Sequence, residues 1–183
     1  TGGYLNNHRH LDPIVFLFSK LVAVRGTVRP IVNDNLHLAA DLEDGSRIIG
    51  QHRITGKETA PLQSAIKRLH LSGHPDRFIP AKSELRKKTR KLINKAELIC
   101  YPPGSYYSSL IANLLPEGVS AAIAGNDCPK IYVPNLGRDP EQFGMSLEQC
   151  VITLLEYLRR GAGEGCGNEN LLNFILLDSN NGD

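Results

Sequence analysis

The clearest periodic pattern in the sequence runs from residue 36 to residue 50. Its first half alternates between apolar and polar or small residues, which is the period of a β-strand with one buried face. The alternating apolar positions are Leu36, Leu38, Ala40 and Leu42. Asp44-Gly45 then provides a tight turn, and Arg47-Ile48-Ile49-Gly50 runs back. The pattern predicts a β-hairpin over about 34–52.

Beyond the hairpin, short apolar runs alternate with segments of helical period. The runs at 97–101, 130–134 and 171–177 have the length of buried strands. Between them, 106–115 and 147–160 have helical patterns. Such an alternation predicts a parallel sheet covered by helices. The predicted fold class is α/β: a Rossmann-like three-layer sandwich with a mainly parallel sheet and a β-hairpin excursion, in which residues 1–183 form a single domain.

The signals on either side of the hairpin are less regular. Asp12-Pro13 before an apolar run predicts a short, largely buried helix up to Val22. The valine-rich segment 22–32 predicts a strand interrupted by a bend. Ser83 is the predicted N-cap of a helix over 84–95, which carries six Lys and Arg residues opposite an apolar side.

The basic helix has two interpretations, a nucleic-acid surface or the solvent face of an amphipathic helix. Aromatic residues are not interleaved with its cations, and the net charge of the whole chain is only +2. We therefore favour a solvent face and expect no nucleic-acid partner.

Composition places the chain among globular proteins. It has 183 residues, 41% of them apolar, which suits one domain with a hydrophobic core. No apolar run approaches the roughly 18 residues that a membrane-spanning helix needs, so we expect a cytoplasmic protein with no membrane partner. The four cysteines are widely spaced and lack the close pairs of zinc sites, and reduced thiols fit a cytoplasmic location.

The segment 97–118 carries the clearest candidate chemistry. A strand ends in the turn Pro103-Gly104-Ser105, and a helix containing Ser108 and Ser109 begins there. Amide N–H groups at a helix N-terminus attract anions, glycine lets the backbone approach a ligand, and serine hydroxyls donate to phosphate oxygens. The same residues also fit an ordinary strand–helix turn. The residues alone leave both interpretations open.

Three sequence blocks resemble the motifs of one family. Pro102-Pro-Gly-Ser-Tyr-Tyr-Ser-Ser-Leu110, followed by Asn113-Leu-Leu-Pro-Glu-Gly-Val119, is similar to GPGSLYTSI…NLLVPGI. The segment 24–50 is similar to VRGxVLP…VhLxAeLeDGxxvxGE, and Tyr132-Val-Pro-Asn135 with 140–146 is similar to YVxN…GETDGYS. These motifs are typical of the CofD-like family, which includes 2-phospho-L-lactate transferases and YvcK-type gluconeogenesis factors. Within this family, the amino-acid sequence is most similar to that of a bacterial CofD-related subgroup.

The resemblance implies the C-terminal part of a CofD-like protein, without the family's N-terminal phosphate loop. It implies a nucleotide diphosphate ligand, such as GDP or a nucleotide sugar, at the 103–109 turn. Asn135 then either contacts the base or ribose, or only forms a turn. In the transferase members, a phospho-organic-acid group moves from a guanosine diphosphate conjugate to a deazaflavin alcohol, with Mg²⁺ and release of GMP. The YvcK-type members bind a nucleotide sugar as regulatory proteins.

Three residues depart from the family pattern: Pro102, Gln51 and Phe143 replace a glycine, a glutamate and an acidic residue. Glu141 is either a metal ligand on a diphosphate or, as we favour, a solvated loop residue. His37 and His52 either line a cleft or, as we favour, face solvent on the hairpin. No residue stands out as a general base, so the catalytic residues stay unassigned. No metal ligand is assigned either, and the resemblance places the Mg²⁺ ligands outside this chain, with a homodimer as a further expectation.

Overall fold

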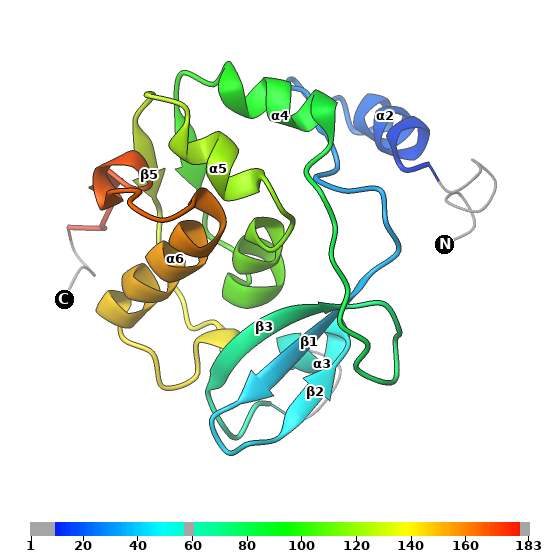
Figure 1. Ribbon diagram of the computed structural model, residues 1–183, viewed down its shortest axis with the longest axis vertical. Coiled ribbons are helices and arrows are strands. Elements are labelled where there is room, and N and C mark those ends of the chain that lie inside the picture. Colours follow the sequence, from blue (N-terminus) through cyan, green and yellow to red (C-terminus); the bar gives the residue numbers. More distant parts are fainter. Residues whose placement is uncertain (1–9, 57–60, 180–183) are drawn as a thin grey trace.

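The computed structural model describes residues 10–56 and 61–179, and it contains two three-stranded sheets (Figure 1). The antiparallel sheet, in the order β2-β1-β3, consists of β1 (His37–Leu42), β2 (Arg47–Ile49) and β3 (Ile66–Ser72). The parallel sheet, in the order β4-β5-β6, consists of β4 (Ile99–Tyr101), β5 (Lys130–Tyr132) and β6 (Phe174–Ile175). The predicted α/β class is confirmed.

The predicted hairpin is formed by β1 and β2. Ala40 pairs with Ile48, and Gly45 in the connecting turn has φ +86°, a value that favours glycine. The hairpin is part of a larger excursion than the sequence indicated, because β3 pairs along the whole of β1.

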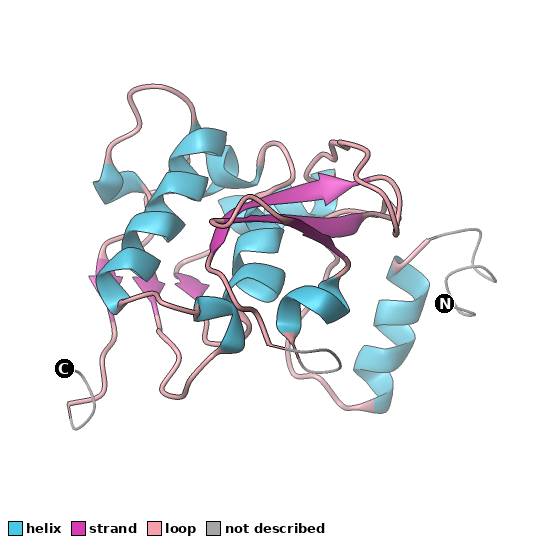
Figure 2. Cartoon of the chain, turned by 90° about the horizontal axis from the view of Figure 1, so that it is seen from below, coloured by secondary structure: helices cyan, strands magenta, loops and turns pink. Residues whose placement is uncertain are grey.

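The three runs expected to form parallel strands do so. Ile99 pairs with Lys130, and Ile131 pairs with Phe174. One face of this sheet is buried, because Tyr101 and Tyr132 belong to the hydrophobic core. Figure 2 shows the short strands of this sheet beside helices. The strands are shorter than the apolar runs that predicted them.

The helical elements are α2 (Asp12–Leu21), α3 (Gln51–Thr55), α4 (Lys87–Asn94), a π-helix (Tyr106–Leu110), a 3-10 helix (Ile111–Leu114), α5 (Val119–Ala124), α6 (Leu147–Ala162), and short 3-10 turns at Pro140–Gln142 and Asn168–Asn170. Helices form near each of the four predicted positions, and α3 and α5 are helices that were not predicted. A capping box of Ser146 and Gln149 starts α6. The helix predicted over 106–115 is a π-helix followed by a 3-10 helix, and the Ser105 carbonyl accepts from both the Ser109 and Leu110 amides at its start. None of the helices in the described residues is long and apolar enough to cross a membrane.

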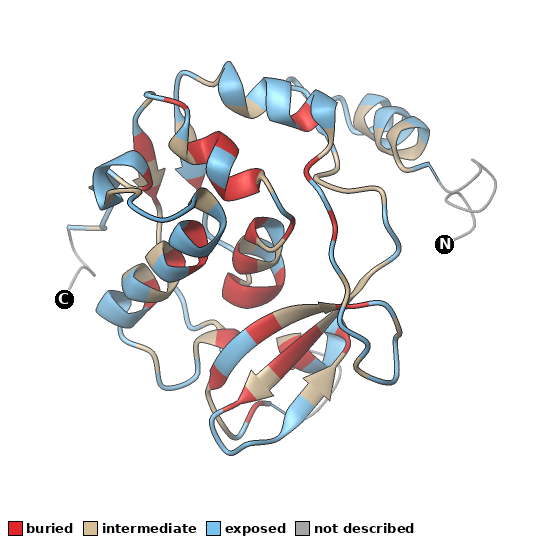
Figure 3. Cartoon of the chain, viewed as in Figure 1, coloured by how far each residue is buried: buried red, intermediate tan, exposed pale blue. Residues whose placement is uncertain are grey.

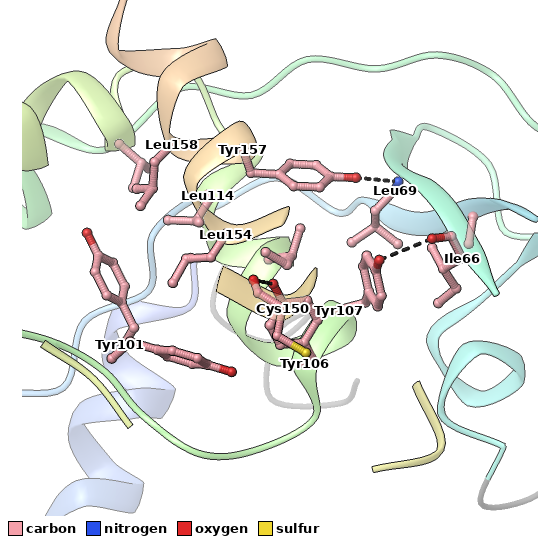
Figure 4. Close-up of a cluster of buried hydrophobic side chains, with 14 of the residues drawn as sticks. Ile66, Leu69, Tyr101, Tyr106, Tyr107, Leu114, Cys150, Leu154, Tyr157 and Leu158 are labelled. Carbon is pink, nitrogen blue, oxygen red and sulfur yellow. Dashed lines mark hydrogen bonds between the residues drawn. The ribbon is translucent and has the colours of Figure 1, made fainter. Parts of the chain in front are cut away.

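Tyrosine hydroxyls join the antiparallel sheet to the helices (Figure 4). The Tyr107 hydroxyl donates to the Ile66 carbonyl at 3.1 Å, and the Tyr157 hydroxyl accepts from the Leu69 amide at 2.7 Å. These bonds satisfy backbone groups on the edge of β3 that faces away from β1. Burial raises the pKa of both tyrosines, so their hydroxyls stay neutral.

The predictions for the N-terminal segment need correction (Figure 3). Helix α2 forms at the predicted position, but none of its residues is buried, and Leu17 is 70% exposed. The apolar run predicted burial, yet no described element covers that side of the helix. The segment 22–32 contains no strand. Its Pro30 and Ile31 carbonyls accept hydrogen bonds from the Thr89 hydroxyl and the Arg86 amide instead.

Helix α4 begins later than predicted. Arg86 is its N-cap, whereas Ser83 is buried and donates a hydrogen bond to the Asp34 carboxylate. Ser83 is therefore used in a contact with a distant segment, and α4 begins at Lys87. The basic residues Lys87, Lys88 and Lys91 are exposed, as the solvent-face interpretation predicted.

Candidate functional site

The turn after β4 lies at the carboxyl edge of the parallel sheet, next to the segment that follows β5. The Gly104 amide donates to Asn135 Oδ1 at 2.7 Å, and Asn135 Nδ2 donates back to the Gly104 carbonyl at 2.7 Å. Gly104 has φ +151°, and a Cβ there would contact nothing within 4 Å. The structure thus brings Gly104 and Asn135 together, and the Asn135 side chain holds the turn by these two hydrogen bonds.

The amides at the start of the π-helix are occupied by carboxylates of the chain itself. The Tyr106 amide donates to Asp139 Oδ2 at 2.6 Å, and the Tyr107 and Ser108 amides both donate to Glu141 Oε2 at 2.7 Å. Glu141 is 1% exposed. An anion does sit at this helix N-terminus, as the physics predicted, but it is a protein side chain.

This arrangement corrects two expectations. The amides at this turn were expected to face a ligand, and those of Gly104 and Tyr106 donate to Asn135 and Asp139 instead. Glu141 was expected to be a solvated loop residue, and it is buried. The Ser108 hydroxyl donates to Glu141 Oε1 at 2.5 Å, so Ser108 belongs to this internal network and not to the surface of a cleft.

The remaining candidates line two clefts on either side of the turn. An apolar cleft of about 510 Å³ is lined by Arg29, Pro30, Ile31, Ile93, Ile99, Cys100, Tyr101, Pro102, Pro103, Gly104, Ser109, Leu110, Asn113, Leu114, Val119 and Ile123. A polar cleft of about 650 Å³ is lined by His37, Gly50, Gln51, His52, Thr55, Pro75, Asp76, Ser105 and Ser109. Ser109 lines both clefts, so the two spaces adjoin at this turn.

Two residues of the polar cleft were assigned to solvent from the sequence. His37 and His52 both line it, because β1 begins and α3 follows β2 at the same end of the antiparallel sheet. The alternation along the hairpin predicted the face of each residue but not that this end of the sheet lies beside the 103–109 turn.

The described residues offer little to a metal ion. They contain no group of three or more His, Cys, Asp or Glu side chains able to hold one. Asp139 and Glu141, the carboxylates nearest the turn, accept hydrogen bonds from backbone amides. These residues by themselves do not fit a Mg²⁺ site.

Comparison with known proteins decides the family. The family model described as "2-phospho-L-lactate transferase CofD" matches residues 5–182. The chain belongs to the CofD family. Relatives include the gluconeogenesis factor of Bacillus subtilis, 32% identical over 162 residues, covering 88% of this chain and 44% of the relative. The gluconeogenesis factor of Listeria monocytogenes is 30% identical over 131 residues, covering 71% of this chain and 36% of the relative.

A solved structure supports the same assignment. The crystal structure of a UPF0052 family protein from Bacillus halodurans aligns with a TM-score of 0.66 and 26% identity, covering 87% of this chain and 45% of that chain. The CofD-type chain therefore spans less than half the length of these relatives.

Proposed function

We propose that this chain contributes one wall of a nucleotide-diphosphate site of the CofD type. The observation that carries the proposal is the placement of Ser105 on the polar cleft and of Ser109 on both clefts, after a parallel strand of a CofD-family fold. Open α/β sheets bind ligands at this edge. Within the described residues, neither serine side chain makes a hydrogen bond, so both hydroxyls are available to phosphate oxygens.

The activity proposed by family membership is transfer of a phospho-organic-acid group from a guanosine diphosphate conjugate to a deazaflavin alcohol, with release of GMP. The role of this chain in such a step is positioning: Asn135 fixes the turn, and the serine hydroxyls orient the diphosphate. Since the described residues do not fit Mg²⁺ alone, its ligands would have to come from other residues, and no step is assigned to it.

Calorimetric titration with GDP tests the proposal. Ser105→Ala removes one hydroxyl donor to a charged acceptor and should weaken binding by roughly tenfold or more. Lys87→Gln, a change on exposed α4, is the control and should leave affinity unchanged. Folded wild-type protein that binds neither GDP nor a UDP-sugar would contradict the proposal.

A second function is a regulatory protein that binds a nucleotide sugar without turnover. It is favoured by the name "gluconeogenesis factor" of the Bacillus and Listeria relatives. Release of GMP from a guanosine diphosphate conjugate supports the transferase, whereas tight binding of a UDP-sugar with no product supports the regulatory function.

A further inference from the structure

The polar cleft differs in chemistry from the apolar cleft on the other side of the turn. Most of its side chains are imidazole, amide, hydroxyl and carboxylate groups, and Gly50 and Pro75 complete the lining, with no benzene ring or branched aliphatic side chain. Such a surface offers hydrogen bonds to oxygen atoms. It therefore fits a small group rich in oxygen.

The position of His52 is determined by the backbone. Gly50 has φ +100°, and a Cβ at this position would lie 2.7 Å from His52 Cε1. The Gly50 amide donates to the Leu38 carbonyl at 2.8 Å, and Ile54 anchors α3 in the core with 0% exposure. The absence of a side chain at Gly50 thus leaves space for the His52 imidazole ring, which lies against the backbone at the end of the hairpin.

Several polar groups of the cleft have no partner in the parts of the chain that the structure describes. The rings of His37 and His52, the Gln51 amide and the two serine hydroxyls make no side-chain hydrogen bond there. In contrast, the neighbouring Ser108 and Asn135 side chains are both engaged. The unpartnered donors come from three separate segments and converge on one space.

We propose that the polar cleft binds the oxygen-rich group attached to the diphosphate, while the nucleoside lies on the other side of Ser109. His37, Gln51 and His52 donate to its carboxylate, phosphate or hydroxyl oxygens, and Asp76 accepts from a hydroxyl. These residues then determine which conjugate is selected. The proposal rests on the proposed nucleotide site, and it adds the part of the ligand that each cleft recognises.

Two pairs of probes distinguish the contributions of the two clefts to binding. The first pair is GDP and the guanosine diphosphate conjugate of a 2-hydroxy acid, and the second pair is UDP and UDP-N-acetylglucosamine. Calorimetry on the full chain gives, for each pair, the affinity ratio of conjugate to parent nucleotide. In His52→Gln and Gln51→Ala we expect the ratio for the preferred pair to fall by roughly tenfold, with parent affinity unchanged. The preferred pair identifies the attached group as an acid or a sugar.

The matched control is His10→Gln, an exposed histidine outside both clefts, which should change neither affinity. Carbon–proton NMR spectra of the imidazoles provide a second readout: the His52 signal should shift with the conjugate and not with the parent nucleotide. Equal losses for conjugate and parent, or an unchanged ratio without a shift, would overturn this inference while the nucleotide site stands. Wild-type protein that binds none of the four probes would overturn both.

Discussion

The amides that start the π-helix and the hydroxyls of Ser105 and Ser109 lie within one turn of each other, yet they differ in what they contact. The Tyr107 and Ser108 amides donate to Glu141, a carboxylate with 1% exposure. The two serine hydroxyls face clefts and have no partner among the described residues.

The difference shows how one turn can combine stability with recognition. Buried polar groups must be paired, since an unpaired one costs about 1–3 kcal/mol. A polar group at the surface costs no stability when it has no protein partner, because water forms hydrogen bonds with it. The amide donors of the turn therefore hold the fold together, and the two hydroxyl donors stay available to the proposed ligand.

Glu141→Ala should have the largest effect on stability. It leaves two buried amides and the Ser108 hydroxyl without their acceptor, and we expect a loss of about 3 kcal/mol or more in the free energy of unfolding. Urea unfolding measures it. Glu141→Gln keeps an acceptor and should lose clearly less. A small loss in Glu141→Ala would mean that another group, or water, replaces the carboxylate.

Ser108→Ala tests the same network with a smaller change. It removes a hydroxyl that donates to Glu141 Oε1 at 2.5 Å, in a residue that is 7% exposed. A hydrogen bond to a charged group contributes about 1.5–3 kcal/mol, and we expect a loss in that range by urea unfolding. Loss of nucleotide binding without loss of stability would instead place Ser108 in the ligand site.

The comparison also explains which parts of the site could be predicted from the sequence. Strand, turn and helix around Gly104 were predicted because each depends on local patterns. The buried role of Glu141 was missed because its partners lie 33 and 34 positions away in the sequence. The placement of His37 and His52 in a cleft was missed for the same reason, since it depends on how two sheets are joined.

The fold itself was predictable where the pattern is periodic. The hairpin and the parallel strands follow from alternation and from short apolar runs. Burial of α2 was predicted wrongly, because an apolar run shows that a helix can be covered but not which element covers it. The N-cap of α4 was misplaced because Ser83 forms its hydrogen bond with Asp34 instead of the helix.

Asp41 provides a partly exposed carboxylate to compare with Glu141. A hydrogen bond from Arg47, helped by one from His70, lowers the pKa of Asp41 to about 2. Because the pKa in the folded state is below the ordinary value of 3.8, the stabilisation is present above about pH 4 and is lost as the pH falls towards 2. The side chain is 27% exposed, so we expect Asp41→Asn to lose only about 1 kcal/mol near pH 7. Urea unfolding of both proteins at pH 7 and pH 3 should show the difference shrinking at the lower pH, and a constant difference would argue against the ion pair.

Ser109→Ala and Ser105→Ala should have the smallest effects on stability. Both remove the same atom as Ser108→Ala in the same short segment, but from a hydroxyl that has no partner in the described chain. We expect changes within about 0.5 kcal/mol, the usual range for surface substitutions. The same two proteins should bind GDP more weakly than wild type. They should therefore lose affinity rather than stability, whereas Ser108→Ala should lose stability. A stability loss comparable to that of Ser108→Ala would show that the hydroxyls are part of the fold, and the division of the turn into a structural and a ligand-facing part would then be wrong.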